Sequence, residues 1–328
     1  MQPGRCPCHP DAALRPVVRD APDTFWGCPG AFSYGRCPEC GSWVLDPRPA
    51  PDEMGPFYAH YYSDDELAAA RKAFADKPAK AALGLDGLRA QVVAKQLQHL
   101  GLALKGARLL DVGCGLGGFA RALRDQAGVE ARGVDFNPTC RAVAAELHGL
   151  TVDVGELAAQ GYAEGSFDLI TSWHCLEHTY DPGAELREMA RAVRPGGLVM
   201  VEVPTPTFWA RLFRGRWFFL QAPTHLYHLR PATLRALVEG AGLSVVQLSR
   251  PYVPTELAGS VLAALGLRGF APRLLFGPRT LADHLWRMLF WTLLPLDFAL
   301  TAGQALFGGA GVLRVFARRP LRDDAGSG

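Results

Sequence analysis

Leu109-Leu-Asp-Val-Gly-Cys-Gly-Leu-Gly-Gly-Phe-Ala120 begins as a short apolar run and leads into a pattern that is compatible with a helix over residues 118–127. Its glycines alternate at positions 113, 115 and 117. Glycine adopts φ angles that other residues avoid, and it lets a ligand approach the bare backbone. The start of a helix also offers unpaired N–H groups. A strand, a glycine turn and a helix in this order predict a nucleotide-binding loop.

Strand and helix patterns alternate from residue 107 to residue 250, which we assign to one core domain. Such alternation predicts an α/β fold with a parallel, doubly wound sheet of the Rossmann-like type. The predicted strands span 108–112, 131–135, 151–154, 167–173, 198–203 and 243–250, and the predicted helices 118–127, 138–148, 185–193 and 231–241. Residues 312–317, within the segment 311–319, read as a closing seventh strand.

Ligands of such sheets bind beyond the carboxyl ends of the strands. Gly113, Asp135 and residues 172–178 all lie at that edge in the predicted sheet. The glycine loop alone is compatible with a dinucleotide or with S-adenosylmethionine. Asp111, two residues before the first glycine, suits a cationic, amino-bearing ligand better than a pyrophosphate. Asp135 is placed to accept hydrogen bonds from ribose hydroxyls, and its alternative role is that of a helix-start carboxylate.

Composition limits the class of protein. The chain has 328 residues, of which 49% are hydrophobic and 20% charged, as expected for a globular protein of about two domains. Its 34 basic and 32 acidic residues nearly balance, which argues against a dedicated nucleic-acid binder. Residues 1–6 contain no apolar run, so no secretory signal is visible and a cytoplasmic location is expected.

Residues 1–50 form a separate, cysteine-rich segment with little helical periodicity. Cys37-Pro-Glu-Cys40-Gly41 is a zinc-knuckle spacing, and Cys6 with either Cys8 or His9 would complete a tetrahedral site. Structural zinc would stabilise a segment with few aliphatic side chains. The choice between Cys8 and His9 stays open, Cys28 is taken as a spare, and the alternative is a flexible arm with free thiols.

The remaining segments are a linker with helices over 51–106, an apolar helical insert over 251–310 and a disordered tail over 320–328. Helices are predicted at 64–76 and 79–100, and the aromatic cluster at 57–62 is read as packing. In the insert, Asp297, Pro295 and Gln304 interrupt the apolar run. We expect its helices to cover the acceptor site or to pack in a homodimer. Membrane-surface contact through 285–313 is a less favoured alternative.

Several motifs in the core carry a family resemblance. Residues 111–117 resemble the first motif of class I S-adenosylmethionine-dependent methyltransferases, and residues 133–138 resemble the second. Further segments resemble the region around strand four and the turn before strand five: 165–170, 174–178, 181–182, 186–191 and 194–198. Taken together, these motifs are similar to those of the methyltransferases related to the ubiquinone-biosynthesis O-methyltransferases. The cysteine-rich start and residues 223–229 resemble a zinc-ribbon subset similar to deoxysugar C-methyltransferases, from which the Cys6-x-Cys8 spacing departs.

The resemblance implies a role for each residue that matches a motif. The backbone of Gly113, Gly115 and Gly117 would lie against the methionine part of the cofactor, with Asp111 near its amino group. The adenosine part would contact Asp135, Phe136 and Glu156, and the sulfonium would lie over Ser172, Trp173 and His174.

Methyl transfer requires orientation of the acceptor and, for a hydroxyl or an acidic carbon, a base. The candidates are His174, His178, His225 and His228, any of which could instead be a hydrogen-bonded loop histidine. His225 is favoured because it follows strand five, over the expected acceptor pocket. The predicted function is methylation of a small-molecule acceptor: a sugar, a glycan or a natural-product intermediate. Alternatives are an RNA methyltransferase docked by its ribbon, or a non-catalytic S-adenosylmethionine-binding protein.

Overall fold

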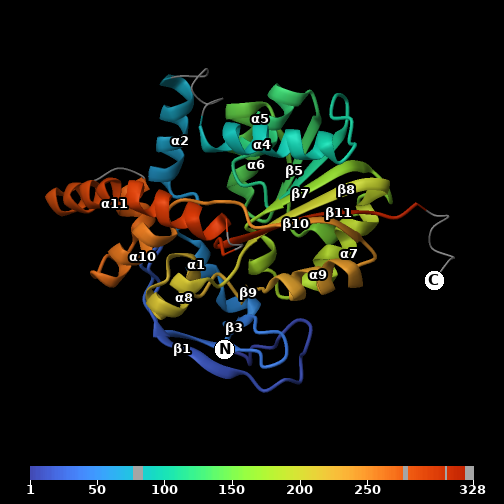
Figure 1. Cartoon of the computed structure of the whole chain (residues 1–328). Helices are drawn as coiled ribbons and strands as arrows, with labels where there is room; N and C mark the ends of the chain where they lie inside the picture. The colour runs from blue at the N-terminus through green and yellow to red at the C-terminus, as the bar shows by residue number, and fades with distance from the viewer. Residues whose placement is uncertain (77–83, 276–279, 307–308, 322–328) are drawn as a thin grey trace.

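The computed structural model describes residues 1–76, 84–275, 280–306 and 309–321. Its centre is a seven-stranded sheet with the order β10-β11-β8-β7-β4-β5-β6 (Figure 1). The strands of this sheet are β4 (Arg108–Val112), β5 (Glu130–Asp135), β6 (Thr151–Val154), β7 (Phe167–Trp173), β8 (Val193–Pro204), β10 (Ser244–Ser249) and β11 (Val312–Arg318). The seven-stranded α/β fold predicted from the sequence is confirmed.

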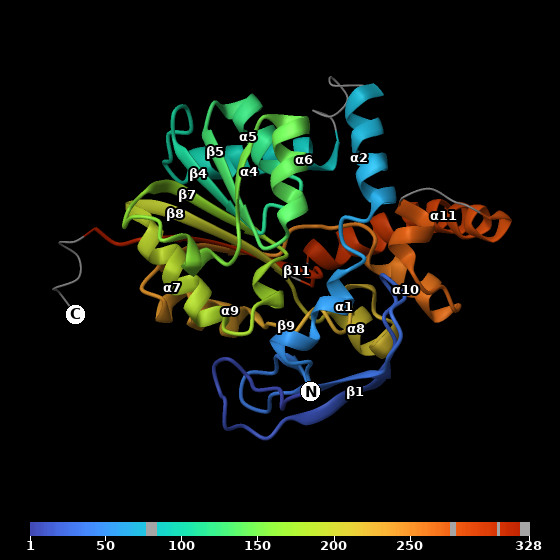
Figure 2. The same cartoon turned by 180° about the vertical axis from the view of Figure 1, so that it is seen from behind.

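Two layers of helices cover the sheet, as Figures 1 and 2 show. One layer holds α4 (Leu85–His99), α5 (Gly118–Ala127) and α6 (Pro138–His148), and the other holds α7 (Pro182–Ala192) and α9 (Pro231–Gly240). Neighbouring strand residues serve opposite layers: Leu109 packs in the cluster that contains α4 and α5, and Leu110 packs in the cluster that contains α7 and α9. Because both faces are buried, the strands read as nearly continuous apolar runs.

The parallel sheet has one exception. β11 runs antiparallel to both of its neighbours, β8 and β10. β8 ends at Pro204, and Val312 at the start of β11 pairs with that same residue. β10 lies between these two strands in the sequence, and its last residue, Ser249, pairs with Arg314 of β11. The insert over 251–310 therefore leaves the sheet after β10 and re-enters it at the same edge, so β11 runs back. The helix predicted at 64–76 is α2 (Asp64–Asp76), and part of the one predicted at 79–100 is α4; residues 79–83 and most of the predicted tail lie outside the described residues.

A second, four-stranded sheet lies at the amino-terminal end of the molecule. It contains β1 (Arg15–Ala21), β2 (Phe32–Arg36), β3 (Trp43–Leu45) and β9 (Tyr227–His228), in that order. β9 comes from the core domain, and its residues pair with Trp43 and Val44 of β3. The amino-terminal segment is thus joined to the core by a backbone ladder. The short helices η1 (Pro51–Glu53) and α1 (Gly55–Tyr58) lead from it toward α2 (Figure 2).

The carboxy-terminal insert is helical, as predicted, with α10 (Glu256–Ala264), η6 (Ala271–Leu275) and α11 (Leu281–Leu306). Asp297 does not interrupt α11; its carboxylate is buried and accepts hydrogen bonds from the backbone N–H groups of Thr255 and Ala258, at the start of α10. The apolar outer face of α11 includes Leu285, Met288 and Trp291. Among the described residues, no helix is long and apolar enough to cross a membrane. Three further short elements follow β8: α8 (Phe208–Phe213), η4 (Arg214–Arg216) and η5 (Phe218–Leu220).

Candidate active site

The glycine loop joins β4 to α5 at the carboxyl edge of the sheet. Gly113, Gly115 and Gly117 have φ angles of +70°, +53° and +79°, in the left-handed region that favours glycine. A Cβ atom at Gly113 would lie 2.6 Å from the sulfur of Cys175, and one at Gly115 would lie 2.9 Å from the hydroxyl of Tyr62. The loop is therefore a backbone cradle that side chains would fill, as the predicted cofactor contact requires.

Asp111 lies under this loop with 3% of its surface exposed. The Thr171 hydroxyl on β7 donates a 2.6 Å hydrogen bond to its Oδ1 atom. Burial raises the pKa of Asp111 to about 7; the Thr171 hydrogen bond opposes this shift, and the charges of Asp86 and Asp135 add to it. A cationic group bound nearby would favour the ionised form. This arrangement suits the amino group that the sequence predicted as its partner.

Asp135 ends β5 and holds the loop in place. Its Oδ2 atom accepts a 2.9 Å hydrogen bond from the N–H of Gly115, and its Oδ1 accepts one of the same length from Asn137. Each carboxylate oxygen has a further acceptor site, so ribose hydroxyls remain possible partners. Phe136 is 53% exposed, and its ring meets that of Tyr58 edge-on at 5.1 Å. Both side chains stand at the edge where an adenosine is expected.

The other predicted cofactor residues are placed differently. Ser172 is buried at the end of β7, beside the loop. Trp173 packs on Phe119 of α5 at a ring distance of 4.8 Å, with the guanidinium of Arg314 over its ring. Glu156 is exposed at the start of η2 (Leu157–Gln160). Trp173 therefore supports the wall of the site, whereas Glu156 is exposed to solvent after the end of β6.

His174 follows β7 in a left-handed conformation, with φ of +47°. Its Nδ1 lies 3.4 Å from Glu177 and its Nε2 lies 3.3 Å from Glu202, two carboxylates with almost no exposure. Glu202 also forms a 2.7 Å ion pair with Arg314. Burial would lower the pKa of His174, but the two carboxylates outweigh it and raise the pKa to about 9. His174 is consequently an imidazolium at neutral pH and is unsuited to accept a proton.

His178 and His225 form a different pair, with ring centres 4.7 Å apart. Nδ1 of His178 lies 2.8 Å from the carbonyl of Thr224, and Nδ1 of His225 lies 2.9 Å from that of Phe219. Because a carbonyl only accepts, each neutral ring carries its proton on Nδ1 and keeps the lone pair of Nε2. Burial lowers the pKa of both rings, and in His225 the nearby His178 and His228 lower it further.

The two rings differ in access. His225 is 3% exposed and its Nε2 lies 3.9 Å from Glu177, whereas His178 is half-buried and borders Tyr58, whose hydroxyl lies 3.1 Å from its Nδ1. His228 is fully buried, and burial lowers its pKa to about 3. The sequence favoured His225 as the base that covers the acceptor pocket. Its ring is almost fully buried in the structure, so it is less accessible to an acceptor than the ring of His178.

Sequence reasoning missed several residues of this site. Glu202 and Arg314 pair across β8 and β11, and each had one signal: a lone charge within an apolar strand. Asp86 of α4 gave no signal, yet a Cβ at Gly118 would lie 2.2 Å from its carboxylate. The aromatic cluster at 57–62, predicted as packing, also contributes Tyr58 and Tyr62 to the site.

Four of the predicted metal ligands come together at the amino-terminal end. One donor atom from each of Cys6, His9, Cys37 and Cys40 lies within 4.8 Å of all the others. The Cys6 sulfur is 3.5 Å from that of Cys40, and Nδ1 of His9 is 3.8 Å from Cys6 and 3.9 Å from Cys37. Donors of a tetrahedral zinc ion stand roughly 3.5–4 Å apart, given Zn–S bonds near 2.3 Å. Three thiolates and an imidazole therefore fit such an ion.

Cys8 does not join this cluster. Its sulfur instead lies 3.9 Å from the backbone carbonyl of Thr233. One residue separates Cys6 from Cys8, whose side chain turns away, and two residues separate Cys6 from His9, whose imidazole joins the cluster. Cys28, read as a spare, lies outside the cluster; its N–H donates to Asp23. Of the two ligands that the sequence left open, the geometry brings His9 to the other three.

A glycine loop with bare backbone, beside Asp111 near the end of β4 and Asp135 at the end of β5, is the arrangement expected of a nucleoside-binding α/β protein. A family model described as a methyltransferase domain matches residues 85–248. The ubiquinone biosynthesis O-methyltransferase of Xanthomonas euvesicatoria is 35% identical over 191 residues, covering 53% of this chain and 76% of the relative. Its namesake in Pseudomonas aeruginosa is 36% identical over 156 residues, covering 43% and 66%. The chain belongs to this methyltransferase family and is an S-adenosylmethionine-dependent methyltransferase.

Solved structures share the fold at lower identity. Phosphoethanolamine N-methyltransferase 2 of Haemonchus contortus, in complex with S-adenosyl-L-methionine, has a TM-score of 0.53 at 18% identity over 85% of this chain and 63% of its own. The [4+2]-cyclase SpnF has a TM-score of 0.51 at 19% identity over 84% of this chain and 97% of its own. Since a cyclase and a methyltransferase both match, these likenesses show the fold and leave the acceptor open.

Proposed function

We propose that this methyltransferase acts on a hydroxyl group of a small molecule, such as a sugar, a glycan precursor or a natural-product intermediate. The observation that carries the proposal is the neutral His178–His225 pair, whose Nδ1 atoms are both engaged by backbone carbonyls. The curated relatives are named as O-methyltransferases, which supports oxygen as the methylated atom. A hydroxyl acceptor needs a base, and a neutral imidazole with a free Nε2 can serve as one.

We assign the role of base to His178 and a supporting role to His225. S-adenosylmethionine supplies the activated methyl group. His178 is half-buried and can meet an acceptor, whereas His225 is 3% exposed behind it. The carbonyl of Thr224 fixes the tautomer of His178, so its Nε2 takes the proton as the acceptor oxygen attacks. Glu177, buried beside His225 and His174, favours positive charge in this region.

The test compares His178→Gln with His225→Gln in a methyl-transfer assay with labelled S-adenosylmethionine and a panel of hydroxylated small molecules. Glutamine at 178 can still donate to Thr224 but cannot act as a base. We expect His178→Gln to lower kcat by about 10²–10⁴-fold, with S-adenosylmethionine affinity changed less than about twofold. His225→Gln should lose less. A full rate in His178→Gln would overturn the assignment, and label found only in RNA or protein would overturn the acceptor class.

We also propose that Cys6, His9, Cys37 and Cys40 hold a structural zinc ion. The support is the donor set and its spacing, since three sulfur atoms and one ring nitrogen gather where few aliphatic side chains do. The site leaves no position for a reacting group, because all four tetrahedral positions are taken by side chains. Its role would be to hold β2, β3 and the chain start together against the core.

A further inference from the structure

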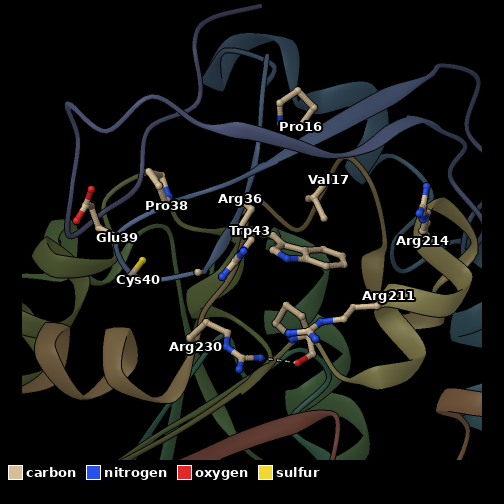
Figure 3. A pocket seen from close by; sticks show the side chains of 12 residues that line it. Pro16, Val17, Arg36, Pro38, Glu39, Cys40, Trp43, Arg211, Arg214 and Arg230 are labelled. Atoms are coloured by element: carbon tan, nitrogen blue, oxygen red, sulfur yellow. Dashed lines mark hydrogen bonds between the residues drawn. The ribbon is translucent and has the colours of Figure 1, made fainter.

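A cavity of about 620 Å³ lies between the amino-terminal sheet and the core, away from the glycine loop (Figure 3). Arginines from four separate segments line it: Arg36 of β2, Arg211 of α8, Arg214 of η4 and Arg230 at the start of α9. Trp43 and proline side chains form its apolar wall. The volume falls within the range of small-molecule sites, roughly 300–1,000 Å³.

The arginines stand close to one another. A Cβ atom at Gly41 would lie 3.4 Å from Nη2 of Arg36 and 3.9 Å from Cγ of Arg230, so both side chains flank that glycine. Burial lowers the pKa of Arg230, and the charges of Arg211 and Arg36 lower it further. Arg230 is fixed in place, because its Nη1 donates a 2.9 Å hydrogen bond to the carbonyl of Pro206 (Figure 3).

The cavity lining carries more positive than negative charge. Within the described ranges, no ion pair joins any of these four guanidinium groups to a carboxylate, and the acidic side chains among the lining residues are Glu39 and the thiol of Cys40. The whole chain has a net charge of only +2, so this concentration of arginine is local. A local excess of positive charge favours the binding of an anion.

We propose that this cavity binds the phosphate group of a small organic phosphate ester. Each guanidinium group can donate two parallel hydrogen bonds to two oxygens of one phosphate. Four guanidinium groups together offer more donors than one carboxylate can accept. The wall of Trp43, Pro16 and Val17 provides apolar surface for the organic part of the ligand. A nucleic acid fits less well, because it needs a basic surface that extends beyond one local cluster.

The cavity also borders the wall of the active site. Trp43 lines the cavity, and its ring centre lies 6.4 Å from that of His228, which in turn lies 5.6 Å from His225. Trp43 and His228 are buried and are register partners in the β3–β9 ladder. The residues that line the cavity include none from the glycine loop. Binding of a phosphate there therefore does not depend on whether His178 is the base.

The experiment measures binding of pyrophosphate and of a nucleoside diphosphate to the full chain by calorimetry, without S-adenosylmethionine. Arg36→Ala and Arg211→Ala should each weaken binding roughly tenfold or more, because each removes charged hydrogen bonds. The matched control is Arg235→Ala on α9, whose exposed side chain pairs with Glu239 outside the cavity; it should leave affinity unchanged. Glu39→Gln removes the negative charge and should strengthen binding.

Equal loss in Arg235→Ala and Arg211→Ala, or no binding of either probe by the wild type, would overturn the proposal. Single-stranded RNA bound more tightly than the nucleoside diphosphate would also overturn it, in favour of a nucleic-acid surface. Thermal melting of each variant shows whether it folds. If an arginine variant does not fold, Glu39→Gln still tests the proposal, because this variant is expected to bind the probe more tightly than the wild type.

Discussion

Thr171 and Asp111 are register partners on β7 and β4, and the Thr171 hydroxyl donates a 2.6 Å hydrogen bond to the buried Asp111 carboxylate. This single donor does not offset the burial of Asp111, whose pKa is raised to about 7. The carboxyl group therefore changes its protonation state near neutral pH. A bound ligand with a cationic amino group would shift it toward the ionised form.

We predict that binding of S-adenosylmethionine releases a proton near pH 6.5. The cationic amino group should favour the Asp111 carboxylate and return its pKa toward the ordinary value near 3.9. Calorimetry in buffers of different ionisation enthalpy measures the release. Asp111→Asn should abolish it and weaken binding, and Thr171→Val, which removes a donor to the carboxylate, should move the release to higher pH. Proton release that persists in Asp111→Asn would show that another group titrates.

Gly113→Ala should disrupt the glycine loop. The new Cβ would lie 2.6 Å from the sulfur of Cys175 at a φ of +70°, so both strain and overlap oppose it. We expect a loss of about 2–4 kcal/mol in the free energy of unfolding and more than tenfold weaker cofactor binding. Gly149→Ala is the control, because its φ is +58° but nothing lies within 4 Å of the added carbon. That variant should lose about 1 kcal/mol, with cofactor affinity unchanged. Similar losses in the two variants, measured by denaturant unfolding, would contradict the steric argument.

His174 should make stability depend on pH in alkaline solution. Its pKa is about 9 in the folded protein and near 6.5 when unfolded. The stabilisation is thus fully present below pH 6.5 and is lost as pH rises through 9. We predict a contribution of about 2 kcal/mol at pH 6, allowing for partial exposure of the ring. His174→Gln should be less stable than the wild type at pH 6 and nearly equal to it at pH 10. A difference that stays constant between these values would rule out the two-carboxylate pairing.

Zinc content tests the proposed metal site directly. Purified protein should contain one zinc ion per chain by elemental mass spectrometry, and Cys37→Ser should contain far less. Cys8→Ser is the matched control, since the Cys8 sulfur lies near the Thr233 carbonyl, outside the cluster. Chelation should lower the melting temperature of the wild type, because the metal holds the amino-terminal segment together. Zinc lost equally from both variants would argue for a different ligand set.

The core could be predicted from the sequence because its determinants are local. Alternating apolar runs and the glycine loop placed β4, α5 and β5 within a residue or so of their observed bounds. Asp111 and Asp135 were found for the same reason, since each lies next to a strand end. These positions depend on chain order and on the strand period, both of which the sequence carries.

The remainder of the site depends on contacts between distant segments. No spacing rule pairs Glu202 with Arg314, and none predicts that Trp43 meets His228, 185 positions further along the chain. The protonation states of His174 and His178 depend on which groups each ring meets after folding. The choice between Cys8 and His9 likewise depended on how one short turn is wound. Such features are set by tertiary packing, which a local pattern does not encode.

The β3–β9 ladder has a consequence for how the molecule comes apart. β9 belongs to the amino-terminal sheet and directly follows the segment that carries Thr224 and His225. Continuous backbone therefore connects this sheet to the wall of the active site. The segment 1–50 and the core should then unfold as one cooperative unit rather than as two independent domains. A fragment that starts at residue 51 would leave β9 as an open edge, and exchange of ribbons between relatives would have to carry residues 227–228 along with them.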